Sequence, residues 1–127
     1  MTTFPYKQNS KGDFFPVIDL YIAYTKDFER TYALIDSGAT ISIFTQDIAQ
    51  KLNLPINKGE EIYLGGVGGR IKGYMHKMKV KLANQNLIIP VVFSYEYFVS
   101  FNLLGRESVF KNFKIIFEEK DYLVKLI

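Results

Sequence analysis

Apolar and polar positions alternate with a period of two along much of the chain, which is the pattern of β-strands with one buried face. Residues 14–24 are rich in aromatic and β-branched side chains, and residues 30–35 form a second such run after a polar interruption at 26–29. The two runs predict a hairpin whose second strand ends at Asp36. Residues 41–44 predict a further short strand.

A helix is expected at residues 45–52. Thr45 can cap its first turn, Asp47 lies within that turn, and apolar residues further along share one face. Leu54 and Pro55 end the segment, because the residue before a proline avoids the helical conformation.

The strand period returns on both sides of a glycine cluster, at residues 60–64 and 71–82. At the end of the second run, lysines alternate with apolar residues, which predicts one buried and one solvated face. The lysines are Lys77, Lys79 and Lys81, and the apolar residues are Met78, Val80 and Leu82.

The last third of the chain predicts an apolar strand at 87–93 after a turn at 83–86. One or two helical turns are expected at 108–113, and residues 114–118 and 122–127 predict a closing hairpin. The whole pattern predicts one compact, mostly β domain over residues 1–127 with one or two short helices.

Composition excludes several classes of protein. The 127 residues suit one domain, and a hydrophobic content of 48% is enough for a core. No apolar run approaches the length of a membrane span, and the first residues lack the pattern of a secretory signal. The absence of cysteine excludes a disulfide scaffold and a cysteine nucleophile and suits a reducing compartment. We therefore expect a cytoplasmic protein that has no membrane partner.

Charge and histidine content bear on ligands. The net charge of +3 is spread along the chain without a basic block. A small barrel that binds nucleic acid through Lys72, Lys77, Lys79 and Lys81 is a possible alternative, but alternating lysines more often form a solvated face, so no nucleic-acid partner is expected. His76, the single histidine, is expected to face solvent, and neither a metal site nor a cofactor is expected.

The triplet Asp36-Ser37-Gly38 places an acid where a buried strand ends. An ordinary turn is one interpretation, since all three residues form turns. A functional site is the other, because a carboxylate beside the core loses solvation and such groups cluster at active sites. Gly38 would allow close approach of backbone or ligand, and the Ser37 hydroxyl could anchor the loop.

Two further segments have both a structural and a functional interpretation. The glycines between 65 and 73 fit neither a Walker phosphate loop nor a dinucleotide fingerprint, which leaves a wide hairpin turn or a mobile hairpin tip over a ligand. The segment 102–107, an apolar strand that ends in Gly105 and is followed by Arg106 and Glu107, is by itself a strand end with surface charges.

The order of these features resembles the retropepsin-like aspartic proteases, and among them the one-domain cellular and prokaryotic members more than the viral ones. The resemblance rests on apolar-apolar-Asp-Ser-Gly-Ala at 34–39, a helix shortly after, the glycine-rich hairpin, and apolar-apolar-Gly-Arg at 103–106. It extends over residues 16–117. It implies a closed, barrel-like acid protease fold and the hydrolysis of peptide bonds.

Carried over by position, the resemblance identifies Asp36 as the catalytic aspartate. Ser37 matches the hydroxyl residue that braces the active-site loop, Gly38 and Ala39 match the floor of the cleft, and Thr40 completes the loop.

The resemblance also implies a substrate-binding flap and a structural element under the site. Gly66, Val67, Gly68 and Gly69 match the flap, within a region that runs from 65 to 73. Leu103, Leu104 and Gly105 match the element that packs under the catalytic loop, and Arg106 matches the arginine that often follows it.

The chain departs from the family pattern at a few positions. Many relatives have Asp or Asn in place of Glu107, retroviral members commonly have Asp in place of Thr40, and the end of the chain predicts a hairpin instead of a single terminal strand.

The family mechanism needs two aspartates, and the chain has one Asp-Ser/Thr-Gly triplet. A homodimer with Asp36 from each subunit is therefore expected to bind and cleave polypeptides. Because the chain ends differ from those of viral relatives, the dimer is expected to be weak. A non-catalytic domain of the same fold that binds a peptide or protein remains the main alternative.

Overall fold

The computed structural model describes residues 1–66 and 68–127. The first half of the chain contains β1 (Thr2–Pro5), β2 (Lys7–Gln8), β3 (Phe14–Phe15), β4 (Val17–Ala23), β5 (Glu29–Ile35), β6 (Ser42–Phe44), α1 (Gln46–Lys51) and η1 (Ile56–Lys58). The second half contains β7 (Glu60–Gly66), β8 (Gly69–Leu82), β9 (Gln85–Phe93), β10 (Asn102–Leu104), η2 (Arg106–Phe110), β11 (Ile115–Glu118), η3 (Glu119–Asp121) and β12 (Leu123–Leu126).

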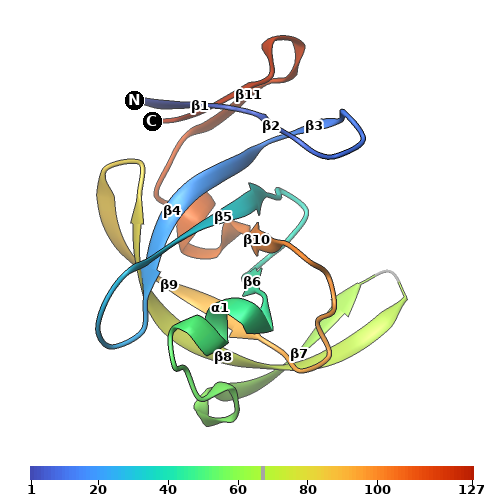
Figure 1. The fold of residues 1–127 in the computed structure, drawn as a ribbon, viewed down its shortest axis with the longest axis vertical. Helices are drawn as coiled ribbons and strands as arrows, with labels where there is room; N and C mark the ends of the chain where they lie inside the picture. Colours follow the sequence, from blue (N-terminus) through green and yellow to red (C-terminus); the bar gives the residue numbers. More distant parts are fainter. Residues whose placement is uncertain (67) are drawn as a thin grey trace.

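Six of these strands close into a barrel in the order β4-β5-β10-β6-β9-β8, because β4 pairs with β8 as well as with β5 (Figure 1). The predicted hairpin of β4 and β5 is confirmed, and its register places Val17 opposite Leu34. The mostly β, barrel-like fold class predicted from the sequence is therefore confirmed. Closure removes the open edges that would otherwise invite pairing with other chains.

The short strand β10 holds a special position between β5 and β6. It runs parallel to β5, with Leu104 beside Ile35, and antiparallel to β6, with Leu103 opposite Ile43. Two segments that are far apart in sequence, the end of β5 and the end of β10, therefore finish side by side.

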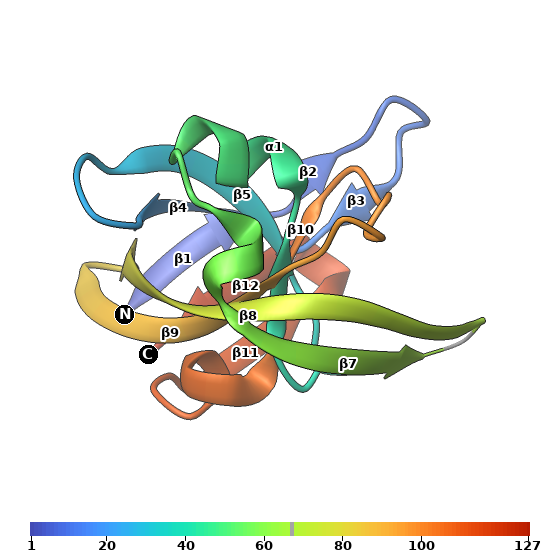
Figure 2. The same cartoon turned by 90° about the horizontal axis from the view of Figure 1, so that it is seen from below.

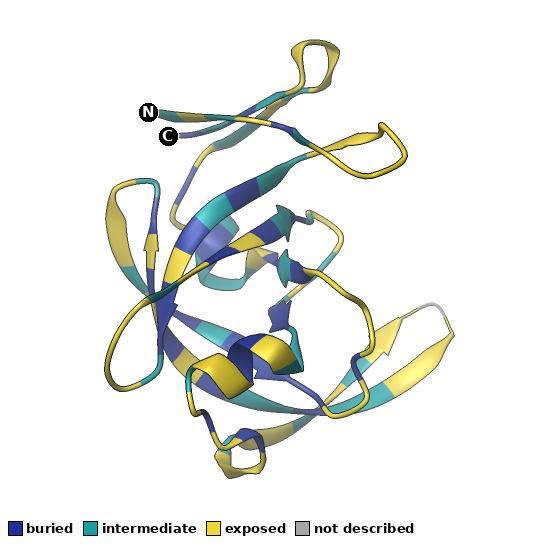
Figure 3. Ribbon diagram, in the orientation of Figure 1, coloured by how far each residue is buried: buried dark blue, intermediate teal, exposed yellow. Residues whose placement is uncertain are grey.

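The core follows the alternation in the sequence. Met78, Val80 and Leu82 on β8 are buried, whereas Lys77, Lys79 and Lys81 are exposed, as predicted. Figure 3 shows such changes between buried and exposed residues along the strands of the barrel. A second, smaller apolar cluster lies near the base of the β7–β8 hairpin and is built on Ile43, Val92 and Tyr97.

The two ends of the chain meet in a separate sheet of three strands, β1-β12-β11 (Figure 1). Thr2 lies opposite Leu126 and Ile115 lies opposite the same residue on the other side, so the predicted closing hairpin is confirmed. Val124 and Leu126 are buried within the chain's own core.

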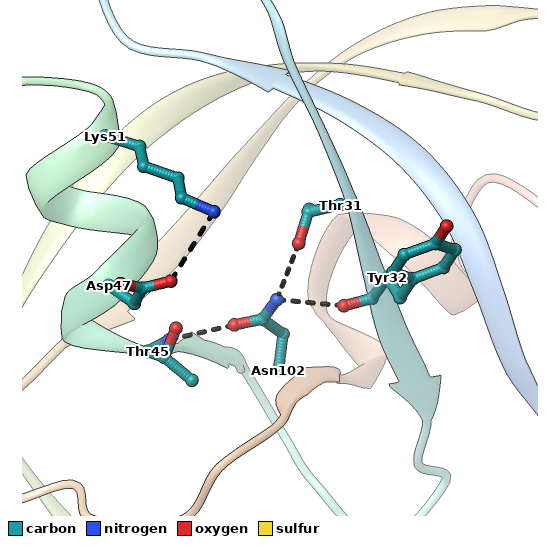
Figure 4. A network of polar contacts seen from close by, with 6 residues as sticks. All are labelled: Thr31, Tyr32, Thr45, Asp47, Lys51 and Asn102. Carbon is teal, nitrogen blue, oxygen red and sulfur yellow. Dashed lines mark hydrogen bonds and ion pairs between the residues drawn. The ribbon is translucent and has the colours of Figure 1, made fainter.

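The helix α1 lies within the predicted segment, but its predicted side-chain cap is wrong. Thr45 occupies the N-cap position without a side-chain cap bond, and its own N–H donates to Asn102 Oδ1 at 2.9 Å. The buried Asn102 also donates to Thr31 Oγ1 at 3.1 Å and to the Tyr32 carbonyl at 2.8 Å (Figure 4). One amide side chain thus joins β5, β10 and the start of the helix.

The expectation that His76 faces solvent is wrong. Its side chain is buried, and Nε2 lies 2.9 Å from the Ile56 carbonyl, so Nε2–H donates there. A Cβ atom on Gly59 would lie 2.5 Å from this nitrogen, which explains the glycine at that position. His76 fixes the turn η1 against the barrel.

No helix in residues 1–66 or 68–127 is long and apolar enough to cross a membrane.

Candidate active site

Asp36 directly follows β5 and is half-buried. Its backbone N–H donates to the Leu104 carbonyl at 3.0 Å. The Gly38 N–H donates to Asp36 Oδ1 at 2.8 Å, and the Ala39 N–H donates to the Asp36 carbonyl at 3.2 Å. The segment is thus a tight turn closed by its own carboxylate, as Asp favours, and this turn orients the acid.

The backbone that follows β10 holds this turn in place through hydrogen bonds. The Arg106 N–H donates to the Ala39 carbonyl and the Glu107 N–H donates to the Thr40 carbonyl, both at 2.9 Å. The Gly105 N–H donates to Ser42 Oγ at 3.0 Å. A Cβ atom on Gly105 would lie 2.6 Å from the Ile41 carbonyl group, so the close approach depends on glycine.

Several predicted residues contribute their backbone and leave their side chains in solvent. The side chains of Ser37, Thr40 and Arg106 are exposed. Among the hydrogen bonds of the described residues, none involves the Ser37 hydroxyl, and the ion pairs of these residues do not include Arg106. The brace predicted for the Ser37 hydroxyl is therefore not formed among the described residues.

The glycine-rich segment forms the end of a long antiparallel hairpin, β7–β8, which projects from the barrel (Figure 2). Gly66 pairs with Gly69 at the end of the ladder. Gly68 and Gly69 have φ of +98° and +121°, which L-residues rarely adopt, and a Cβ atom on any of the four described glycines between 65 and 69 would meet no atom within 4 Å. Val67 lies outside the described residues.

Gly73 differs from the glycines at the tip. A Cβ atom there would overlap the Val92 side chain, so this residue serves packing at the base of the hairpin.

A cleft of about 520 Å³ separates the Asp36 turn from the hairpin. Its floor includes Gly38, Ala39 and Thr40, which follow the aspartate, and its roof includes Gly65, Gly66 and Gly69. The walls are mainly apolar and comprise Ile41, Ile43, Leu64, Ile71, Tyr97 and Leu103. The cleft has the apolar lining and few polar groups that are typical of a ligand site.

Tyr97 is the wall residue that connects the cleft with Asp36. Its ring is buried, and its hydroxyl donates to the Phe101 carbonyl at 2.7 Å. Burial raises the pKa of Tyr97 to about 12, and the negative charge of Asp36 contributes to this shift. Asp36 is therefore close enough to the cleft wall for its charge to act on a side chain there.

A family model for aspartyl proteases matches residues 26–107, more than half of the chain. The chain belongs to the aspartyl protease family. The matched segment includes Asp36, the projecting hairpin and β10, and so contains every part of the cleft described above.

Solved structures place this aspartyl protease among the retropepsin-like folds, as the sequence analysis predicted. A retropepsin-like aspartic protease from Rickettsia conorii superposes with a TM-score of 0.69 at 18% identity, over 98% of this chain and 99% of that one. The EIAV protease, in complex with the inhibitor HBY-793, gives a TM-score of 0.57 at 21% identity, over 72% of this chain and 82% of that one. At these identities the likeness establishes the fold. No curated protein matches the chain in sequence.

Sequence reasoning missed two contributions to the site. Tyr97 belongs to a loop without a hydrophobic period, so no pattern predicts that it lines the cleft. Asn102 stood at the start of a predicted strand, and a polar residue before Leu-Leu-Gly was the available signal for a buried network.

No cluster of three or more potential metal ligands occurs among the residues that the structure describes.

Proposed function

We propose that this aspartyl protease is an endopeptidase in which Asp36 from each subunit of a homodimer forms the catalytic pair. The observation that carries the proposal is the position of Asp36, which is held in a turn beside an apolar cleft under a glycine-rich hairpin. Family membership supports the same chemistry.

The two carboxylates would share one proton. The ionised Asp36 takes a proton from a water molecule as the water oxygen attacks the peptide carbonyl carbon, and the protonated Asp36 donates a hydrogen bond to the carbonyl oxygen. When the tetrahedral intermediate collapses, the C–N bond breaks, and the leaving nitrogen takes up the proton that the first Asp36 received from water, which returns the pair to its singly protonated state. Like charges in close contact cannot both ionise readily, so the pair acts as a unit.

A second subunit is needed because the other aspartates of the chain have different settings. Asp19 on β4 forms ion pairs with Lys7 and Arg30, each at 3.0 Å. Asp47 on α1 faces Lys51 at 3.6 Å (Figure 4). Asp13 lies between β2 and β3, Asp27 lies before the start of β5, at the opposite end of that strand from Asp36, and Asp121 belongs to η3. A two-fold axis beside the exposed Ser37 would place one Asp36 opposite the other.

The cleft favours an extended polypeptide with apolar side chains near the scissile bond. Its walls are aliphatic and aromatic, and the open backbone of Gly65 and Gly66 offers main-chain groups to a peptide. Closure of the hairpin over the peptide would shield the site from bulk water and leave the attacking water molecule in place.

The first prediction concerns the aspartate itself. Asp36→Asn should abolish cleavage in a peptide-library digest and leave the urea unfolding curve of the protein intact, because the amide keeps the shape but cannot take a proton from water. Wild-type activity should rise as pH falls from neutral and decline when both carboxylates of the pair are protonated. Inhibitors that mimic the tetrahedral intermediate should block it. Equal cleavage by both proteins would refute the proposal, and peptide binding by wild type without cleavage would favour a non-catalytic binding domain.

A further inference from the structure

A second hollow, of about 550 Å³, adjoins the cleft at Ile41, which lines both. Its surface includes Met75 on β8, Ile88 and Pro90 on β9, and Ser108. Ile88 is 66% exposed, and together with Met75 and Pro90 it gives the hollow an apolar part that is open to solvent.

One face of β8 connects the cleft with this hollow. Because alternate residues of a strand share a face, Ile71 in the cleft and Met75 in the hollow are followed on the same face by Lys77, Lys79 and Lys81. Figure 2 shows β8 running from the tip of the projecting hairpin to the opposite side of the barrel. A chain that leaves the cleft past Ile41 therefore meets apolar surface first and then a row of ammonium groups.

The three lysines have no acidic partner among the described residues, although the Lys81 ammonium lies 4.3 Å from the centre of the Phe28 ring. Elsewhere many cations have partners: Lys72 faces Glu61 at 3.6 Å, Lys111 faces Glu107 at 2.8 Å, and Lys125 faces Glu118 at 2.7 Å. Among the ion pairs of residues 1–66 and 68–127, none involves Lys77, Lys79 or Lys81.

The single carboxylate at the hollow is already engaged. Glu107 lines the hollow with Lys77, but the Lys111 ammonium holds the pKa of Glu107 below its usual value and compensates its charge. The net charge available to a ligand along this face of β8 is therefore positive.

The strand geometry suits an extended peptide. Side chains on one face of a strand recur every two residues, about 6.6–6.8 Å apart, and an extended peptide repeats its own side chains at the same interval. Acids at alternate positions of such a peptide would each meet one lysine.

We infer that the hollow and the row of lysines form an auxiliary docking site for the substrate, which takes an extended segment with an apolar residue followed by alternating acids. This inference rests on the proposed function and adds a substrate class to it: polypeptides with an acidic segment some residues away from the scissile bond. In a two-fold dimer each subunit carries one such site, so the segment can lie on either side of the cleaved bond.

The test uses three peptides built on the shortest sequence that the wild-type protein cleaves in the library digest. The first is that core alone, the second adds a tail with one leucine and alternating glutamates, and the third carries the same tail with lysines in place of the glutamates. We compare kcat/KM between four proteins: wild type, the double variant Lys77→Glu/Lys79→Glu, Ile88→Asp, and the control Lys11→Glu. Peptide binding is measured by fluorescence anisotropy on the same four proteins, each with the additional substitution Asp36→Asn to prevent cleavage. The control makes one Lys→Glu change, half of the charge change of the double variant, in the exposed turn between β2 and β3.

The acidic tail should raise kcat/KM about tenfold through a lower KM, since several exposed charge pairs and one apolar contact act together. The gain should shrink in high salt. It should disappear in the double variant and in Ile88→Asp, persist in Lys11→Glu, and be absent for the lysine tail, while the core peptide is cleaved equally by all four proteins.

An acidic tail without effect on wild type, or a gain that survives the double variant, would overturn the inference and leave the endopeptidase proposal standing. Cleavage by Asp36→Asn would instead refute the endopeptidase proposal and the inference with it. A single-stranded oligonucleotide that binds these lysines more tightly than the acidic tail does would assign the face to nucleic acid and also overturn the inference.

Discussion

At the scale of single residues, the position of Asp36 depends on a residue without a side chain. Gly105 lets the backbone after β10 approach the turn closely. As a result, the N–H groups of residues 105, 106 and 107 all donate to the segment 39–42. The Ile41 carbonyl group occupies the place that a Cβ atom would take. This contact sets the distance between the backbone after β10 and the segment that follows Asp36.

Gly105→Ala should therefore damage stability and activity together. The added methyl group would push backbone apart at a buried site, which typically costs about 1–3 kcal/mol, and a small shift of the catalytic group should lower kcat by about 100-fold. Urea unfolding and steady-state kinetics measure the two effects. Gly65→Ala is the matched control, because a Cβ atom there meets no atom within 4 Å and should leave the free energy of unfolding unchanged. A Gly105→Ala protein with wild-type stability and turnover would show that the contact does not control the site.

The burial of a residue could be predicted from the sequence where the residue belongs to a strand with alternating apolar and polar positions. Met78, Val80 and Leu82 are buried as predicted, and His76 shares their parity, so the same alternation contained the signal that His76 is buried. Tyr97 and Asn102 act through partners far along the chain or within an irregular loop. No local pattern encodes such contacts.

At the scale of elements, the hairpin of β7 and β8 combines a paired stem with an open tip. The cross-strand register is continuous from Glu60 opposite Met75 to Gly66 opposite Gly69. Arg70 lies over the Tyr63 ring at 4.7 Å and stiffens the outer part of the stem. The glycines at 68 and 69 have positive φ angles, which other residues rarely adopt. Those at 65 and 66 have ordinary φ angles and open space around them.

This difference selects the substitution that tests the hairpin as a flap. Gly66→Val should change the free energy of unfolding by less than about 0.5 kcal/mol, because the side chain enters open space. It should slow turnover several-fold, because the glycine lines the cleft and closure would press the new side chain against the substrate. Asn86→Val, on the exposed face of the other hairpin of β8, should alter neither quantity. Unchanged turnover in Gly66→Val would remove the support for a flap.

The positions of strands and hairpins could be predicted from the sequence more readily than the pairing of distant strands into a barrel. The period of two located β4, β5, β8, β9 and the closing hairpin of β11 and β12. Closure of the barrel through β4 and β8, and the insertion of β10 between β5 and β6, depend on pairings between distant segments. These pairings are decided by the packing of the whole core, which a local pattern does not contain.

At the scale of the whole molecule, the terminal sheet sets the conditions for a dimer. β12 pairs with β1 on one side and with β11 on the other, so it cannot pair with a second subunit. The two edges of this sheet that could pair with a second subunit are β1 and β11. The edge of β1 ends in Pro5, which cannot donate a backbone hydrogen bond. The edge strand β11 has no proline and carries Phe117, which is 40% exposed. We expect self-pairing along β11, over a short edge, and hence a weak dimer.

The central claim, that two chains share one catalytic pair, is tested most directly by mixing wild-type and Asp36→Asn chains. The two proteins are combined in urea at varied ratios and constant total concentration, refolded together, and assayed on one peptide. If each active site needs Asp36 from both subunits, activity will fall as the square of the wild-type fraction, because mixed dimers hold one intact aspartate. Activity that falls in direct proportion to the wild-type fraction would show that a single chain is sufficient and would contradict the account.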